Sequence, residues 1–343
     1  MPQREVTDSI SYRRIGVVIE NNWILIKKDI NLRGSVCVLP KGMTLCAKGG
    51  MLKNGTLIGN DTKIQGGSVL FDKVKIEGTW NIPEISTRMF ADLSYENSLR
   101  DVVSLANPRI KNRIVIQEGN YIVAAHKNGD VCIPVGSNTD LMINGTIRLV
   151  PNSYKSYSMI LLKGNNIHVF GKGSVIGDKH THTGTAGEWG MGIRMTGAVD
   201  SSVKGLTVKD CWGDCIYIGG DSKKILIENC TLDNGRRQGV SITKADHVTI
   251  RKCKITNVSG TNPQYAIDIE PNKGDVVTKI VIERVEVKDC EGGILATKPS
   301  VKKDTLNSSR IGDVVIKNCK IAVFSKYPLN LKDCDYSKVE GCT

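Results

Sequence analysis

Acidic side chains occur at related places in neighbouring short segments in the middle of the chain. Asp214 precedes the segment CIYI, and Asp268 lies inside AIDI, followed two residues later by Glu270. Two carboxyl groups about 6.5–9.5 Å apart can hydrolyse a glycosidic bond, one as the acid and the other as the base that activates water. We therefore interpret Asp214 as a candidate general acid and Asp268 or Glu270 as the candidate base.

Other polar and aromatic residues gather around these carboxylates. They come from the insertion GDKHTHTGTAGEWG and from the segments GRRQG and YAIDIEPN, whereas the next segment has only Gly292, Leu295 and Ala296 at the matching places. Trp189 or Trp212 could stack against a sugar ring. The candidate substrate-binding residues are Asp178, His182, Glu188, Trp189, Arg237, Gln238 and Asn272.

Each of these residue types also has a purely structural interpretation. Asp214 follows Gly213 and could cap a turn through its own backbone. Arg237 could belong to a surface ladder of ion pairs, and His180 and His182 could be solvated loop residues. The concentration of polar residues on three or four adjacent segments favours a functional site.

The segments that carry these residues repeat at a nearly constant spacing. The central aliphatic residues of GIRM, CIYI, GVSI, AIDI and GILA are 23, 24, 27 and 27 residues apart. A repeat of this length with short β-branched strands is typical of a β-solenoid, whose coils stack about 4.8 Å apart. Asp214 and Asp268 are then two coils apart, about 9.6 Å, and Asp268 and Glu270 are about 6.5–7 Å apart at the backbone.

Strand alternation assigns these residues to faces of the coil. Ile193, Ile216, Val240, Ile267 and Ile294 are predicted to point inward, and the outward column is predicted to contain Arg194, Tyr217, Ser241, Asp268 and Leu295. Matching the segments GLTVKDC, KILIENC, HVTIRKC, KIVIERV and DVVIKNC predicts a second inward row. That row would consist of Cys211, Cys230, Cys253, Val285 and Cys319.

The eleven cysteines are therefore interpreted as buried, reduced thiols rather than disulfides. No pair has the spacing of a zinc site, so no metal site is predicted. The N-terminus has no apolar stretch, and no segment reaches membrane-spanning length. Together these features favour synthesis in a reducing cytoplasm, without a signal peptide.

Composition along the chain suggests three parts. Residues 1–22 are a polar lead-in, residues 23–112 a β-rich N-terminal cap with a connector helix, and residues 113–343 a parallel β-helix with a glycan groove. The best helical candidate is 84–112, with Leu99, Val102, Val103 and Leu105 on one side. The fold class predicted is all-β.

Residues 36–80, then IQEGNYIV, NGTIRLVPNS and GDKHTHTGTAGEWGMGI, resemble right-handed parallel β-helix proteins of the pectate-lyase-like superfamily, in particular gut-bacterial members and tailspike-type proteins of phages. The resemblance covers roughly 35–335 and implies the fold. The superfamily holds lyases, hydrolases, epimerases and non-catalytic adhesins, so the resemblance leaves the activity open.

The chemical template with the most similar motifs is the polygalacturonase-like hydrolase family. WGDCIYI and RQGVSI resemble two of its motifs, and Asp214 matches its catalytic acid. Gly213 replaces a second Asp, Gln238 replaces a His, and Met191 lies where the Asp of the first motif would be. Asp268 and Glu270 replace the Arg and Lys that grip a substrate carboxylate. This change argues against an anionic sugar at that place, because like charges repel.

We therefore expect a protein that binds and hydrolyses a bacterial surface polysaccharide, without a cofactor. A non-catalytic virion or adhesin β-helix is the alternative, and a lyase using Ca²⁺ on the carboxylates is the third. The net charge of +12 is interpreted as a basic exterior or as attraction to a polyanionic glycan, not as a nucleic-acid site. A homotrimer or other virion partners, and release by lysis, would accompany a phage origin.

Overall fold

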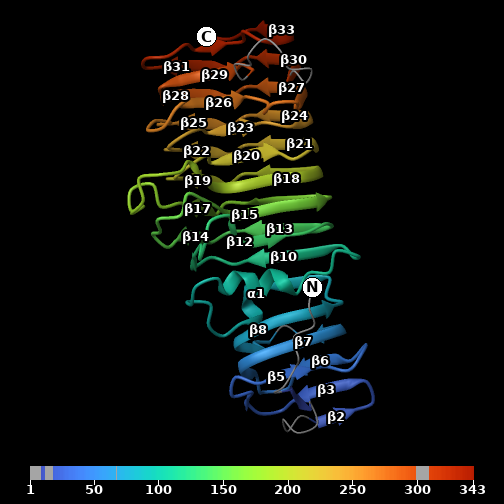
Figure 1. Ribbon diagram of the computed structural model, residues 1–343. Helices are drawn as coiled ribbons and strands as arrows, with labels where there is room; N and C mark the ends of the chain where they lie inside the picture. The colour runs from blue at the N-terminus through green and yellow to red at the C-terminus, as the bar shows by residue number, and fades with distance from the viewer. Residues whose placement is uncertain (1–8, 12–17, 67, 299–308) are drawn as a thin grey trace. The chain divides into compact units, whose positions relative to one another are not determined.

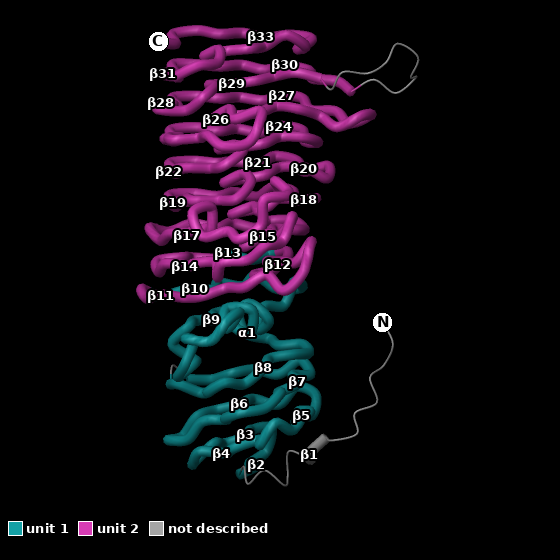
Figure 2. The backbone as a smooth tube through the Cα atoms, turned by 60° about the vertical axis from the view of Figure 1, so that its left-hand side comes forward, with its two compact units in different colours: residues 1–117, 138–140 teal, residues 118–137, 141–343 magenta. Residues whose placement is uncertain are grey.

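The computed structural model describes residues 9–11, 18–66, 68–298 and 309–343, and their regular secondary structure is almost entirely β-strand. The chain divides into two compact units, residues 1–117 with 138–140 and residues 118–137 with 141–343 (Figure 2). Most of the predicted polar lead-in, 1–22, lies outside the described residues. No helix in the described ranges is long and apolar enough to cross a membrane.

Unit 1 is built mainly from parallel strands, with one antiparallel pair formed by β2 and β3. Its elements are β1 (Ser9–Ser11), β2 (Val18–Glu20), β3 (Trp23–Ile26), β4 (Ile30–Asn31), β5 (Val36–Val38), β6 (Thr44–Ala47), β7 (Leu52–Gln65), β8 (Phe71–Trp80), β9 (Glu84–Ser86), the 3₁₀ helix η2 (Thr87–Met89), α1 (Ser98–Ser104) and β10 (Asn112–Ile116). The strand β13 (Thr139–Ile143) contains residues of both units.

The helix predicted over 84–112 is much shorter in the structure. Only Ser98–Ser104 is α-helical, because the preceding residues form β9 and η2 and Phe90 is extended. The predicted apolar side is present, with Leu99, Val102 and Val103 buried. The periodicity identified the buried side correctly, but the segment around it was assigned to the wrong type of structure.

Unit 2 is a parallel β-helix whose coils are stacked in order of sequence (Figure 1). In most coils one strand joins each of three parallel sheets. The first sheet contains β12 (Asp130–Val135), β15 (Ser156–Asn165), the first half of β18 (Trp189–Lys204), β20 (Ile216–Gly219), β23 (Val240–Ile242), β26 (Tyr265–Ile269), β29 (Gly292–Ala296) and β32 (Leu329–Asn330).

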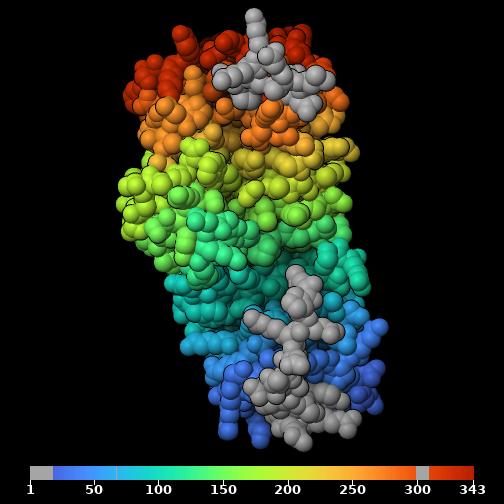
Figure 3. All heavy atoms as spheres, in the orientation of Figure 1, coloured from blue at the N-terminus to red at the C-terminus, as the bar shows by residue number. Residues whose placement is uncertain are grey.

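The second and third sheets complete each coil. The second contains β16 (Ile167–Gly171), the second half of β18, β21 (Ser222–Glu228), β24 (Ala245–Arg251), β27 (Val276–Glu283), β30 (Arg310–Lys317) and β33 (Cys334–Glu340). The third contains β11 (Asn120–Val123), β14 (Thr146–Leu149), β17 (Ser174–Ile176), β19 (Thr207–Lys209), β22 (Thr231–Asp233), β25 (Lys254–Thr256), β28 (Glu286–Cys290) and β31 (Lys320–Val323). In the space-filling view the coils follow one another as bands of colour from green to red (Figure 3).

The strand register confirms both columns predicted for the first sheet. The inward residues Ile193, Ile216, Val240, Ile267 and Ile294 are paired in succession and are fully buried. The same pairings align the outward residues Arg194, Tyr217, Ser241, Asp268 and Leu295. Residues that are two dozen positions apart in sequence therefore become neighbours in one column, which we call the site column.

The predicted row of cysteines is wrong at its first member. Val203 pairs with Ile227, so the residue equivalent to Cys230 is Leu206, three positions after Val203. Backbone hydrogen bonds of the next coils align Cys230, Cys253, Val285 and Cys319. Cys211 instead follows β19 in the third sheet, because the segment GLTVKDC resembles strands of the second sheet without being one. All eleven cysteines are free thiols, as predicted.

Charged residues of opposite sign alternate along the outer end of the second sheet. Successive strand pairings align Lys204, Glu228, Arg251, Glu283, Lys317 and Glu340, which we call the charge column. Glu228 lies 2.7 Å from Nε of Arg251 and 3.7 Å from Nζ of Lys204. Each coil therefore presents a charge that attracts the coils on either side.

Candidate functional site

A pocket of about 340 Å³ opens on the outer side of the first sheet of unit 2. It lies over the site column and over the ends of the strands that carry that column. Its lining residues are Gly129, Ser156, Trp189, Met191, Arg194, Asp214, Tyr217, Arg237, Ser241, Thr243, Asp268, Glu270 and Asn272. The three predicted catalytic carboxylates therefore share one pocket.

Asp214 lies at the entry to β20 and its side chain is completely buried. Its Oδ2 accepts a hydrogen bond of 2.8 Å from Oγ of Ser241, and its Oδ1 lies 3.6 Å from Nη1 of Arg237. Burial raises the pKa of Asp214 to about 6, although Arg237 and Ser241 act in the opposite direction. Oδ1 has no hydrogen-bond partner among the described residues, so the ionised form is stabilised by Ser241 at one oxygen and by the charge of Arg237 at the other.

Asp268 lies in β26, in the site column, and has a different environment. Its Oδ2 accepts a hydrogen bond of 2.7 Å from Nε2 of Gln238, while its buried Oδ1 has no hydrogen-bond partner among the described residues. Burial raises the pKa of Asp268 well above its usual range, and the carboxylates of Glu270 and Asp214 raise it further. These surroundings favour the neutral, protonated form of the Asp268 carboxyl group.

Gln238 is fully buried between two coils, and both ends of its amide are fixed. The backbone N–H of Tyr265 donates a 2.8 Å hydrogen bond to Oε1 of Gln238. Because an N–H group must face an acceptor, Nε2 is left to donate to Asp268. Gln238 is not a lining residue of the pocket, so the structure places it behind Asp268 rather than against a ligand.

Arg237 lies among the carboxylates and is only 15% exposed. Besides Asp214 it lies 3.8 Å from Glu188 and 3.6 Å from Glu270. Burial lowers the pKa of Arg237, but the carboxylates of Asp214, Asp268, Glu188 and Glu270 outweigh this effect and raise it. The predicted substrate-binding arginine therefore has its charge balanced by the protein itself.

Trp189 and Asn272 lie at the pocket, as expected for residues that touch a ligand. Trp189 begins β18 and remains 50% exposed, which leaves an aromatic surface at the pocket wall. Asn272 follows β26 and donates a 3.2 Å hydrogen bond to Asp275. Glu188 lies in the insertion, directly before β18, and reaches the pocket through Arg237.

The structure does not bring Asp178 and His182 to the pocket. Both side chains are completely buried, and Nδ1 of His182 lies 2.8 Å from Oδ2 of Asp178. The ring of His182 stacks on Trp212 at 3.8 Å, and the guanidinium of Arg236 covers the same tryptophan ring at 3.7 Å. These residues fasten the insertion to the coils beneath it, so Trp212 is unavailable as a sugar-stacking surface.

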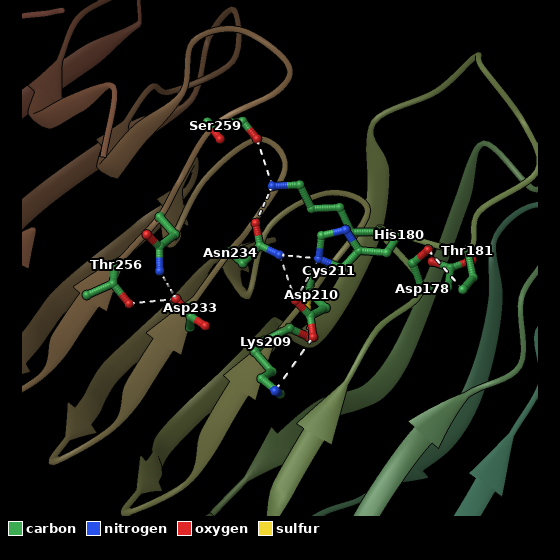
Figure 4. A network of polar contacts seen from close by, with 12 residues as sticks. Asp178, His180, Thr181, Lys209, Asp210, Cys211, Asp233, Asn234, Thr256 and Ser259 are labelled. Carbon is green, nitrogen blue, oxygen red and sulfur yellow. Dashed lines mark hydrogen bonds and ion pairs between the residues drawn. The ribbon is translucent and has the colours of Figure 1, made fainter. Parts of the chain in front are cut away.

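The beginning of the insertion is held by a second polar network, on turns after strands of the third sheet (Figure 4). Nζ of Lys179 donates to Oδ1 of Asn234 at 2.5 Å and to the carbonyl oxygen of Ser259 at 2.9 Å. Asn234 in turn donates to Asp210 at 2.6 Å and contacts Nε2 of His180 at 2.7 Å. None of these residues lines the pocket, and their contacts account for how the insertion is anchored.

Several lining residues were absent from the sequence-based set. Ser241, Tyr217 and Arg194 were placed in the same column as Asp268 by the repeat spacing, but they were not included among the candidate site residues. Tyr217 contacts Thr243 through a 2.7 Å hydrogen bond between their hydroxyls.

No group of three or more His, Cys, Asp or Glu side chains in the described ranges is arranged to hold a metal ion. In the pocket the guanidinium of Arg237 is the cation that the carboxylates share. Acid–base chemistry needs only groups that hold protons at different pH values, and Asp214 and Asp268 meet this requirement.

Comparison with known proteins identifies the type of β-helix. Residues 152–309 match the family model described as a right handed beta helix region. Together with the parallel register of the coils, this match shows that these residues form a right-handed parallel β-helix, as predicted.

Two curated proteins of Bacillus subtilis (strain 168) match part of the chain. The uncharacterized protein YclG is 31% identical over 189 residues, covering 46% of this chain and 32% of that protein. The SPbeta prophage-derived uncharacterized protein YorA is 25% identical over 188 residues, with the same two shares. The chain thus spans about a third of the length of the curated relatives it matches.

Among solved structures, one similar chain is the tailspike protein gp49 from Acinetobacter baumannii bacteriophage Fri1, a capsular polysaccharide depolymerase. The TM-score is 0.46 at 14% identity, and the match covers 76% of this chain and 50% of that chain.

Proposed function

We propose that this right-handed parallel β-helix binds a bacterial surface polysaccharide in the pocket over its first sheet and hydrolyses a glycosidic bond there. The observation that carries the proposal is the pair Asp214 and Asp268, two buried carboxyl groups of raised pKa that line the same pocket. Carboxyl groups whose pKa values are moved by their surroundings are typical of acid–base catalysis.

The charges around the pocket favour an uncharged sugar at this position. Arg237 is balanced by Asp214, Glu188 and Glu270, so it has little attraction left for a substrate carboxylate. Oδ1 of Asp268, which has no hydrogen-bond partner in the described part of the chain, would accept a hydrogen bond from a sugar hydroxyl or donate its own proton. Trp189 supplies an exposed ring on which the apolar face of a sugar can stack.

Lyase chemistry is less well supported by the same contacts. A lyase that acts on a uronate must neutralise the carboxylate of its substrate, usually with a free cation. Two arginines line this pocket. Arg237 is already paired with three carboxylates that would repel a uronate, and Arg194 donates to Thr196 and lies over the ring of Tyr217. Calcium bound to these carboxylates would have to displace the guanidinium.

The second candidate is a virion protein that holds a glycan without cleaving it, alone or as a homotrimer. The prophage-derived relative favours this candidate, because it places a similar sequence in a prophage. This interpretation also agrees with the predicted cytoplasmic synthesis and later release by lysis.

A panel of purified capsular and cell-wall polysaccharides separates these functions. Incubation with the protein should release new reducing ends from one of them, without the ultraviolet absorbance of an unsaturated uronate. We expect Asp214→Asn to lower turnover by about 10²- to 10⁴-fold, the usual contribution of a general acid or base.

The matched control is Asp246→Asn, which alters a carboxylate of the second sheet that is not in the pocket. Full turnover by Asp214→Asn would contradict the catalytic assignment. Binding of a polysaccharide by the wild-type protein without any cleavage would favour the virion candidate.

A further inference from the structure

We infer that Asp268 is the general acid of the proposed hydrolysis and Asp214 its base, and that Gln238 is the positioning residue that directs the proton of Asp268 to Oδ1. These roles are the reverse of those expected from the sequence. The inference rests on the proposed function and adds to it the place of each proton before the reaction.

The orientation of the Gln238 amide decides which oxygen of Asp268 can carry a proton. Its Oε1 accepts from the backbone N–H of Tyr265 at 2.8 Å, and a rotated amide would place two donors face to face. Nε2 therefore donates to Oδ2 of Asp268 at 2.7 Å and keeps that oxygen an acceptor. A proton on Asp268 is then directed to Oδ1, the oxygen that has no partner among the described residues.

Asp214 and Asp268 differ in the hydrogen-bond donors and charges that surround their carboxyl groups. Asp214 receives a hydrogen bond from Ser241 and the positive charge of Arg237, both of which favour its ionised form. Asp268 has one neutral donor, and the carboxylates of Glu270 and Asp214 oppose its ionisation, although Arg237 favours it. Glu188 adds negative charge on the side of Asp214, where Arg237 balances it.

The proposed reaction consists of two proton transfers that accompany cleavage of the glycosidic bond. Oδ1 of Asp268 gives its proton to the glycosidic oxygen as the bond from that oxygen to the anomeric carbon breaks. Asp214 takes a proton from water as the water oxygen bonds to the same carbon. The products are a hemiacetal and an alcohol, and exchange with solvent returns a proton to Asp268 and removes one from Asp214.

A test that needs no substrate is the titration of the two side chains by NMR. The full chain is labelled with ¹³C at the aspartate carboxyl carbon, and Asp214→Asn and Asp268→Asn assign the two signals. We expect Asp214 to titrate near its pKa of about 6 and Asp268 to titrate at a higher pH. Gln238→Met should move the titration of Asp268 further upward, because a donor that stabilises the ionised form is lost.

The matched control is Gln264→Met, which changes a glutamine of the loop before β26 that is outside the pocket and should leave both titrations unchanged. If Gln238→Met does not give the circular dichroism of the folded protein, Gln238→Glu serves in its place. It should also raise the titration of Asp268, since it adds a third carboxyl group beside it. Titration of Asp268 below Asp214, or no movement in the Gln238 variant, would overturn the inference.

Kinetics provide the second readout, on a polysaccharide that the wild-type protein shortens. With these roles, turnover rises through about pH 6 as Asp214 ionises, and falls at higher pH as Asp268 loses its proton. The opposite roles give a pH profile of the same shape with a lower maximum, so the leaving-group comparison decides between the two assignments. Asp268→Asn should lose about 10²- to 10⁴-fold on the polysaccharide and far less on an aryl glycoside whose leaving group needs no proton.

The NMR titration and the kinetics test the order of the catalytic roles and the proposed hydrolysis separately. Cleavage by a wild-type protein whose Asp268 is ionised at neutral pH would remove the assigned order and leave the proposed hydrolysis intact. If no polysaccharide in the panel is cleaved, the proposed function fails and the catalytic roles fail with it.

Discussion

Two columns on the outside of the same β-helix arrange their charges in opposite ways. In the charge column, Lys204, Glu228 and Arg251 begin a series in which each residue faces neighbours of opposite sign. Around the site column, the carboxylates of Asp214 and Asp268 share a single guanidinium and are buried. In the charge column each charge is balanced by a neighbouring residue of opposite sign. In the site column, burial and grouping raise the pKa of the carboxyl groups.

The difference shows how a repeat protein separates stability from chemistry. Alternating charges are a regular pattern that supports the register of the coils and requires no burial. Buried carboxylates that lie close together lower the free energy of unfolding, and such groups occur mostly at functional sites. Substitutions in the two columns should therefore change stability in different ways.

The largest effect on stability is expected at Arg237, the shared cation of the pocket. In Arg237→Met the carboxylates of Asp214, Glu188 and Glu270 lose their counter-ion, and breaking a largely buried pair costs about 3–5 kcal/mol of unfolding free energy. Urea unfolding at neutral pH measures this loss. Arg284→Met, on an exposed arginine paired with its neighbour Glu283, should change the free energy little, and equal losses in both variants would contradict the comparison.

An intermediate effect is expected at Asp214, with the sign set by its raised pKa. Because the folded state binds the proton more tightly than the unfolded chain, the contribution of Asp214 to stability is complete below the ordinary pKa of an aspartate. It is lost as the pH rises through about 6, by about 3 kcal/mol for a pKa that moves from 3.8 to about 6.

Asp214→Asn removes this dependence. Relative to the wild-type protein, the variant should therefore gain stability as the pH rises from the acid range to neutrality. Unfolding curves of both proteins at several pH values test this, and parallel curves across the range would contradict the raised pKa.

The smallest effect is expected in the charge column. Glu228→Gln removes the attraction to Arg251 and Lys204 but leaves the shape unchanged, and we expect a loss of no more than about 1 kcal/mol. Glu228→Lys should cost more, because it places three cations in succession, and salt should reduce that added cost. Thermal unfolding at low and high salt measures both variants, and a Glu228→Lys protein as stable as Glu228→Gln at low salt would show that the column does not support the register.

The sequence predicts the parts of the site that belong to the repeat. Asp268 and Ser241 could be assigned to one column because strands alternate with a period of two and coils recur every two dozen residues. The insertion that contains Asp178 and His182 has no counterpart in other coils, so nothing in the sequence indicates that these side chains are buried against Trp212. The opposing environments of Asp214 and Asp268 depend on contacts between coils, which a single strand does not specify.

The row of cysteines shows a related limit. Strands of the second and third sheets both alternate β-branched and charged residues, so the segment before Cys211 could be matched to the wrong strand of the coil. The residue type was still informative, since a position shared by Cys and Val must be apolar and inward.

The reactivity of these thiols can report which coils of the protein unfold first. Nine of the eleven are buried at points spread along the chain, and only Cys334 and Cys342, in the last described coil, are partly accessible. Coils of a solenoid are held chiefly by their neighbours, so they can open without unfolding the whole chain. A thiol reagent would then mark the coils in the order in which they open, and the modified cysteines, identified by mass, would map where unfolding begins.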